Sequence, residues 1–111
     1  MREIKFRAWD KEREEIVPVT QLFWDILGNL KTPDSFILMQ YTGLKDKNGK
    51  EIYEGDICKF QFKRNQGQDI SEVGFDAGEF KFCADGFFYS VGRCSVIEVI
   101  GNIYENPELV K

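Results

Sequence analysis

The sequence contains no histidine. Serine–histidine–aspartate and cysteine–histidine catalysis both need an imidazole base, and many zinc sites use histidine ligands. The absence therefore excludes these two kinds of active site, histidine-ligated metals and a pH switch based on histidine. We accordingly expect a protein that is not an enzyme and that uses no cofactor and no metal ion.

Cysteine is scarce, with Cys58, Cys83 and Cys94 as the three examples. Their number is odd and no two follow the C-x-x-C spacing, so the sequence offers neither a disulfide framework nor a zinc site. Cys58 and Cys83 each lie close to phenylalanine, a setting typical of cysteines that act as small buried hydrophobic residues. We expect all three thiols to be reduced and structural.

Long apolar runs are also missing. The longest stretch without a charged residue runs from Ser35 to Leu44, which is ten residues, whereas a membrane-spanning helix needs roughly 20. The first residues alternate charged and apolar side chains and show no apolar core of a secretory signal. We therefore expect a soluble, cytoplasmic protein with no affinity for membranes.

The length of 111 residues and the ordinary share of hydrophobic residues, 42%, predict one globular domain over residues 1–111. The net charge is 15 − 19 = −4. Residues 1–50 carry nine basic and eight acidic side chains, whereas residues 51–111 carry six and eleven. The acidic second half disfavours non-specific binding to nucleic-acid phosphates.

Alternating apolar and polar residues predict β-structure along most of the chain. Residues 2–19 indicate an antiparallel hairpin in which Pro18 suits an edge strand. Residues 20–28 fit either a short capped helix or a strand, and we favour strand or irregular structure because eight or nine residues are few for a stable helix. The later strands are expected at 36–41, 57–62, 70–75, 79–83, 87–91 and 96–104, with a turn at Asn48-Gly49 and a capped turn beginning at Pro107. This spacing predicts a small antiparallel β-barrel, mainly within residues 36–104, preceded by the hairpin.

Two loop motifs are incomplete. Residues 43–51 resemble a phosphate-binding loop, but five residues separate the glycines and Glu51 replaces the magnesium-binding serine or threonine. Residues 46–51 begin like a calcium loop, but Lys50 occupies the third ligand position. Neither motif therefore predicts a ligand, and the lysines of this stretch suit a solvated hairpin tip.

Two clusters of charged residues have both a structural and a functional interpretation. Glu51, Glu54 and Asp56 could do acid–base chemistry, but a turn in which Asp56 binds nearby backbone explains them better. A strand end that mixes basic and aromatic side chains could stack bases and hold phosphates, although a core-facing strand has the same pattern. The candidate interaction residues there are Lys59, Phe60, Phe62, Lys63 and Arg64.

Three segments of the sequence resemble the YopX family of phage and prophage proteins. They are MREIKFRAWD at 1–10, of which residues 2–10 match, MQYTGLKDKNGKEIYEGDI at 39–57, and VIGNIYENPEL at 99–109. The resemblance implies a mainly β protein with an SH3-like barrel, encoded by phages or prophages of bacteria, largely Gram-positive ones. It implies no catalytic residue or cofactor. The polar residues of these segments are candidates for buried hydrogen bonds or for a self-association surface: Gln40, Thr42, Asp46, Tyr53 and Asn102.

Two hypotheses of function follow. The first is a non-enzymatic accessory protein that binds a host or phage protein or forms homo-oligomers, since exposed sheet edges can pair with other chains. The alternative is a small β-barrel that binds nucleic acid through the basic and aromatic strand end, which rests on analogy between folds.

Overall fold

A computed structural model describes residues 5–19, 35–61, 68–84 and 86–110. These residues form β-strands joined by short turns, together with two short 3-10 helices. The elements are β1 (Phe6–Asp10), β2 (Glu15–Pro18), β3 (Phe36–Lys45), β4 (Glu51–Tyr53), β5 (Asp56–Gln61), β6 (Gln68–Glu72), β7 (Gly74–Asp76), β8 (Glu79–Ala84), β9 (Phe87–Ser90), η2 (Val91–Arg93), β10 (Ser95–Asn102) and η3 (Pro107–Val110).

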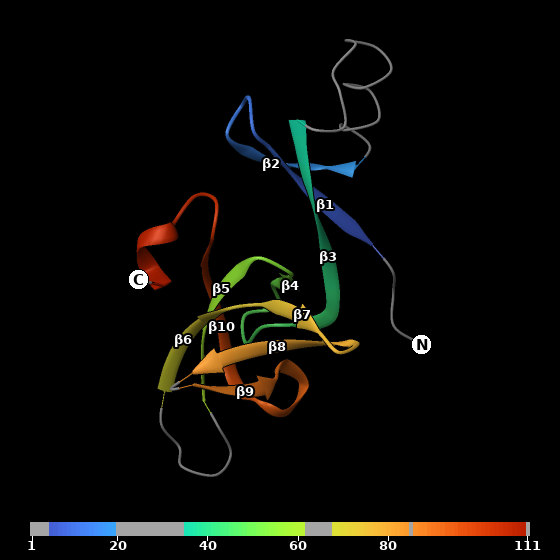
Figure 1. Cartoon of the computed structure of the whole chain (residues 1–111). Helices are drawn as coiled ribbons and strands as arrows, with labels where there is room; N and C mark the ends of the chain where they lie inside the picture. The colour runs from blue at the N-terminus through green and yellow to red at the C-terminus, as the bar shows by residue number, and fades with distance from the viewer. Residues whose placement is uncertain (1–4, 20–34, 62–67, 85, 111) are drawn as a thin grey trace.

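The first sheet begins as an arm, made of β1, β2 and the start of β3, that projects from the rest of the molecule, whereas β4 lies among the other strands (Figure 1). Its strand order is β2-β1-β3-β4, and neighbouring strands are antiparallel. β1 pairs with β2 through Ala8 and Val17 and with β3 through Ala8 and Leu38. The predicted hairpin is therefore confirmed, and Pro18 lies on an edge strand, where its missing N–H costs no ladder hydrogen bond.

The remaining strands curl around the main core as a half-barrel. β10, β5 and β6 form one antiparallel sheet, and β7, β8 and β9 form another. Only Val73 separates β6 from β7, and the backbone N–H of Cys83 on β8 donates to Ser71 Oγ on β6 at 2.9 Å. The two sheets thus follow one another along a bent β6–β7 segment, which Figure 1 shows wrapping over β5 and β10.

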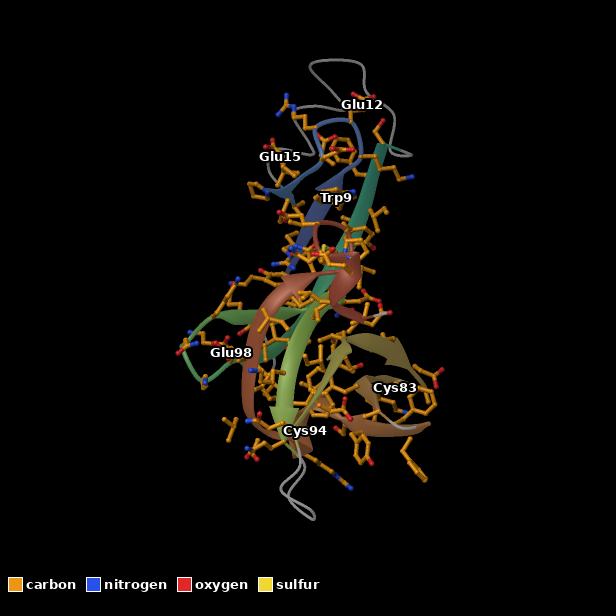
Figure 2. The ribbon with its side chains drawn as sticks, turned by 90° about the vertical axis from the view of Figure 1, so that its left-hand side faces the viewer. Trp9, Glu12, Glu15, Cys83, Cys94 and Glu98 are labelled. Atoms are coloured by element: carbon orange, nitrogen blue, oxygen red, sulfur yellow. The ribbon has the colours of Figure 1, made fainter. Side chains whose placement is uncertain are left out.

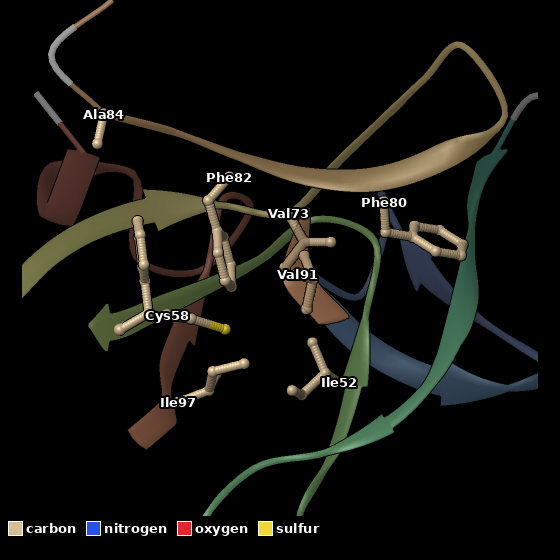
Figure 3. Packing of buried hydrophobic residues seen from close by; sticks show 9 residues of the cluster. Ile52, Cys58, Val73, Phe80, Phe82, Ala84, Val91 and Ile97 are labelled. Atoms are coloured by element: carbon tan, nitrogen blue, oxygen red, sulfur yellow. The ribbon is translucent and has the colours of Figure 1, made fainter. Parts of the chain in front are cut away.

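The main core lies inside this curl (Figure 3). Its centre is the stacked pair Phe60 and Phe82, both fully buried, whose ring centroids are 4.1 Å apart. Along β8 the core residues alternate with outward-facing ones, as expected for a sheet that buries one face. The other members of the core come from β4, β5, β8, η2 and β10 and from the link between β6 and β7. They are Ile52, Cys58, Val73, Phe80, Ala84, Val91 and Ile97.

A second core cluster joins the arm to the end of the chain. Trp9 of β1 stacks on Tyr104, with ring centroids 5.5 Å apart, and packs with Met39, Tyr41 and Tyr53. Because Tyr104 follows β10, this cluster connects the arm, the β3–β4 hairpin and the C-terminal turn.

The all-β prediction is confirmed for the described residues, and the strands predicted at 36–41, 57–62, 79–83, 87–91 and 96–104 are found within a few residues of their expected bounds. The single strand predicted at 70–75 is wrong, because the chain bends at Val73 and divides it into β6 and β7 of different sheets. η3 begins at Pro107, as expected. The described strands form a half-barrel in which no ladder joins β9 to β10. Residues 20–28, for which strand or irregular structure is favoured, lie outside the described residues, and within the described ones no helix is long and apolar enough to cross a bilayer.

The core predicts a large difference between two phenylalanines of neighbouring strands. Phe82→Ala should destabilise the protein by about 3–5 kcal/mol because it removes a buried ring and leaves a cavity. Phe88→Ala should change the free energy of unfolding by less than about 0.5 kcal/mol, since that side chain is 65% exposed. Urea denaturation of both variants measures the difference, and equal losses would contradict the assigned core.

Candidate interaction surface

The structure places part of the predicted basic and aromatic strand end in the core. Phe60 is fully buried against Phe82, so its structural interpretation is correct and it offers no ring to a partner. Lys59 is half-buried on β5, paired in register with Ile70 of β6 and Glu98 of β10. The other three residues, Phe62, Lys63 and Arg64, lie outside the described residues.

The three clustered carboxylates lie at a turn, as the structural interpretation predicted. Asp56 is 1% exposed, accepts a hydrogen bond at 2.8 Å from the backbone N–H of Tyr53, and forms an ion pair with Arg7 of the arm. Glu51 pairs with Lys5 and accepts a hydrogen bond from the Tyr53 hydroxyl. Among the described residues, no group of three acidic or cysteine side chains could hold a metal ion.

Tyr53, a predicted interaction residue, lies within this charged junction. Its side chain is buried, and the guanidinium of Arg7 lies 4.3 Å from its ring centroid. Burial and the nearby Glu51 carboxylate raise the pKa of Tyr53. The ring thus helps to hold the arm on the half-barrel and presents little surface to a partner.

The backbone of the turn Glu54-Gly55-Asp56 is bonded to several parts of the fold. The N–H of Glu54 donates to Gln40 O on β3, and the N–H of Gly55 donates to Val73 O between β6 and β7. The N–H of Val73 donates to Asp56 O, and that of Ile103 donates to Gly55 O. Among the described residues, the turn is therefore bonded to β3 of the first sheet, to the residue that links β6 to β7, and to the residue after β10.

Polar residues in the segments that resemble YopX satisfy other turns. Asp46 accepts hydrogen bonds from the backbone N–H groups of Asn48, Lys50 and Val99, which fastens the β3–β4 hairpin to β10. Burial alone would raise the pKa of Asp46, but these bonds lower it overall. Asn102 accepts from the N–H groups of residues 104 and 105. These side chains have the buried hydrogen-bonding role that was one of their two predicted roles.

The three thiols differ in their surroundings. Cys58 is fully buried, as expected, and burial raises its pKa. Burial also raises the pKa of Cys94 to about 11. The expectation that Cys83 is buried is wrong: it is exposed on β8, where Phe82 and Ala84 occupy the core-facing positions on either side of it. Side-chain alternation along the strand therefore turns Cys83 outward.

Around Cys83, which Figure 2 labels, the outward face of β8 forms a shallow groove. We call it the outer groove. Phe88 of β9 lies opposite Cys83 in register, so both side chains share this face, and Gly74 lies opposite Lys81. The Lys81 ammonium is 5.9 Å from the ring centroid of Phe88 and 4.0 Å from Asp76. The lining residues are Ser71, Glu72, Gly74, Phe75, Asp76, Lys81, Cys83 and Phe88.

Exposed phenylalanines mark the groove and its surroundings. Phe88 is 65% exposed, Phe87 66% and Phe75 47%. Sequence reasoning did not single out Phe87 and Phe88 as site residues. Their adjacency was a usable signal, because successive residues of a strand point to opposite faces and only one of the two can face a one-sided core.

Comparison with known proteins identifies the family of this chain. Residues 26–111 match the family model described as YopX protein. The chain belongs to the YopX family. The sequence-based resemblance is therefore confirmed. The matched range includes the connecting turn, the outer groove and both half-barrel sheets.

Two solved structures are similar to this chain. The chain is 39% identical over 70 residues to the SPbeta prophage-derived uncharacterized protein YopX of Bacillus subtilis (strain 168), and that alignment covers 57% of this chain and 52% of the relative. The crystal structure of B. subtilis YopX matches with a TM-score of 0.63 and 26% identity, covering 100% of this chain and 98% of that one. The crystal structure of protein EF1440 from Enterococcus faecalis matches with a TM-score of 0.66 and 28% identity over the full length of both chains. The sequence match to the curated relative thus spans about half of its length.

Alanine substitutions at two glycines test how much the turn Glu54-Gly55-Asp56 contributes to stability. Gly55 has φ 88° and Gly49 has φ 82°, so alanine should cost about 1–2 kcal/mol at either position for its left-handed backbone. An added Cβ at Gly55 would lie 3.0 Å from Met39 Cε, whereas at Gly49 it would meet nothing within 4 Å. Urea denaturation should therefore show a larger loss for Gly55→Ala. An equal loss would show that the turn tolerates the extra methyl group.

Two buried aspartates predict opposite pH dependences. Because its pKa is lowered in the folded state, Asp46 contributes stability above the unfolded pKa of about 3.8, and this is lost as pH falls through the folded pKa. Burial raises the pKa of Asp56 more than Arg7 and the Tyr53 N–H lower it, so its contribution is lost as pH rises through the folded pKa.

The measurement is the free energy of unfolding of wild type minus that of the Asp46→Asn or Asp56→Asn variant, between about pH 3 and 7. The difference should fall toward acid for Asp46→Asn and fall toward neutral pH for Asp56→Asn. A difference that instead rises toward neutral pH for Asp56→Asn would show that the Arg7 charge outweighs burial.

Proposed function

We propose that this YopX-family protein is a non-enzymatic protein-interaction module that uses the outer groove to bind a host or phage protein in the bacterial cytoplasm. The observation that carries the proposal is Phe88, a ring 65% exposed at the edge of a groove. Aromatic side chains beside a concavity are frequent anchors of protein interfaces, because their burial on binding removes a large apolar area from water.

The roles of the reactive side chains support a non-catalytic protein. Asp56 and Glu51 are engaged in ion pairs and hydrogen bonds that hold the arm on the half-barrel. The raised pKa values of Cys58 and Cys94 disfavour their nucleophilic thiolate forms. These carboxylates and thiols therefore have structural explanations, whereas the exposed aromatic side chains at the outer groove do not.

The nucleic-acid alternative receives less support. Of its two proposed stacking rings, Phe60 is buried and Phe62 lies outside the described residues, and residues 68–84 carry four carboxylates and one lysine. Such a surface repels phosphates.

We also propose that the half-barrel is SH3-like. The antiparallel order β10-β5-β6, continued through β7 to β8 and β9, and the short η2 before the last strand are consistent with a small barrel of this kind. The outer groove would then lie on the convex face of the barrel wall, where partners have access.

The test is affinity capture from a bacterial lysate, with and without nuclease treatment, using wild type, Phe88→Ser and Leu38→Ser. Leu38 is a matched control because it is 55% exposed on β3 of the arm and lines no part of the groove. Wild type and Leu38→Ser should retain the same protein, and Phe88→Ser should lose it by roughly tenfold or more. Equal retention by Phe88→Ser, or recovery only of nuclease-sensitive nucleic acid, would refute the proposal.

A further inference from the structure

We infer that the outer groove binds a peptide segment carrying lysine or arginine next to an apolar side chain. The inference rests on the proposed function and names its partner by chemistry. It combines two properties of this surface: the size and aromatic lining of the groove, and the charge around it.

The groove has room for one side chain. Its volume is about 220 Å³, below the roughly 300–1,000 Å³ of sites that enclose a small-molecule ligand. Gly74 creates part of this space, because a Cβ there would have no neighbour nearer than Lys81 O at 4.0 Å. Phe75 and Phe88 are among the lining residues, so an apolar side chain entering the groove would remove exposed aromatic surface from water.

The surrounding charge selects a cationic neighbour for that side chain. The described residues 68–84 contain four carboxylates, namely Asp69, Glu72, Asp76 and Glu79, against the single ammonium of Lys81. Lys81 already has a partner, since it lies 4.0 Å from Asp76. Glu72 lines the groove, and Glu79 lies opposite the lining residue Asp76 in register. The carboxylates of Glu72 and Glu79 would therefore face the flanks of a bound peptide. Opposite charge at an interface rim steers association and rejects acidic partners.

The same charge argues against a second copy of this chain on the groove. A two-fold symmetric dimer would place each surface against an identical one. Glu72, Asp76 and Glu79 would then face the same carboxylates of the partner, and such like-charge contacts cost binding energy.

A random linear-peptide display library, selected on the wild-type protein, tests the inference. Selected peptides should be enriched in lysine or arginine adjacent to an apolar residue. Their binding should weaken by roughly tenfold in Phe88→Ser, and it should also weaken in Glu79→Lys. Glu15→Lys is the matched charge control, because Glu15 is an exposed carboxylate on β2 of the arm, far from the groove in Figure 2; its affinity should not change.

Enrichment of neutral or acidic peptides, full binding by Phe88→Ser, or no enrichment would overturn the inference. So would concentration-dependent dimerisation in sedimentation experiments that Phe88→Ser abolishes. Failure of the inference is distinguishable from failure of the proposed function. If the lysate capture depends on Phe88 but selected peptides are not basic, the groove is an interaction site whose partner has different chemistry.

Discussion

The fold depends on the turn Glu54-Gly55-Asp56. Its backbone bonds reach β3, the β6–β7 bend and the segment after β10, and the Asp56 carboxylate adds an ion pair to Arg7 of the arm. A buried carboxylate without such a partner would be strongly unfavourable, so Arg7 of the arm stabilises the buried Asp56. The same ion pair holds the arm on the half-barrel. Gly55 permits the arrangement because it has φ 88° and leaves room for Met39.

Local patterns predicted most of the fold because its elements depend on local rules. Alternation located the strands, Asn48-Gly49 marked the β3–β4 turn, and Pro107 marked the last 3-10 helix. The hairpin at the start followed from two short alternating segments around a polar connection. No local pattern in the sequence shows how the sheets pack together. The half-barrel and the ion pair between Arg7 and Asp56, which are 49 positions apart, are therefore visible only in the structure.

The same limit applies to the candidate site. A strand has two faces, and composition does not say which one is buried, so Phe60 had two interpretations until its stacking on Phe82 placed it inside. Cys83 was assigned to the core because of its aromatic neighbours, yet its position between core-facing Phe82 and Ala84 requires the opposite face. The same alternation explains why Phe88 faces outward, because Phe88 lies opposite Cys83 in register.

The outer groove lies in a different part of the chain from the segments that resemble the YopX family. Residues 39–57 and 99–109 supply the connecting turn, the Asp46 hydrogen bonds and the Asn102 turn, which are architectural roles. The groove is built from residues 71–88, where the sequence has no such motif. A scaffold fixed by its turns can keep its fold while strands β6 to β9 change their outward side chains. If the proposed function holds, YopX-family proteins that share this fold should differ in the partner that each one binds.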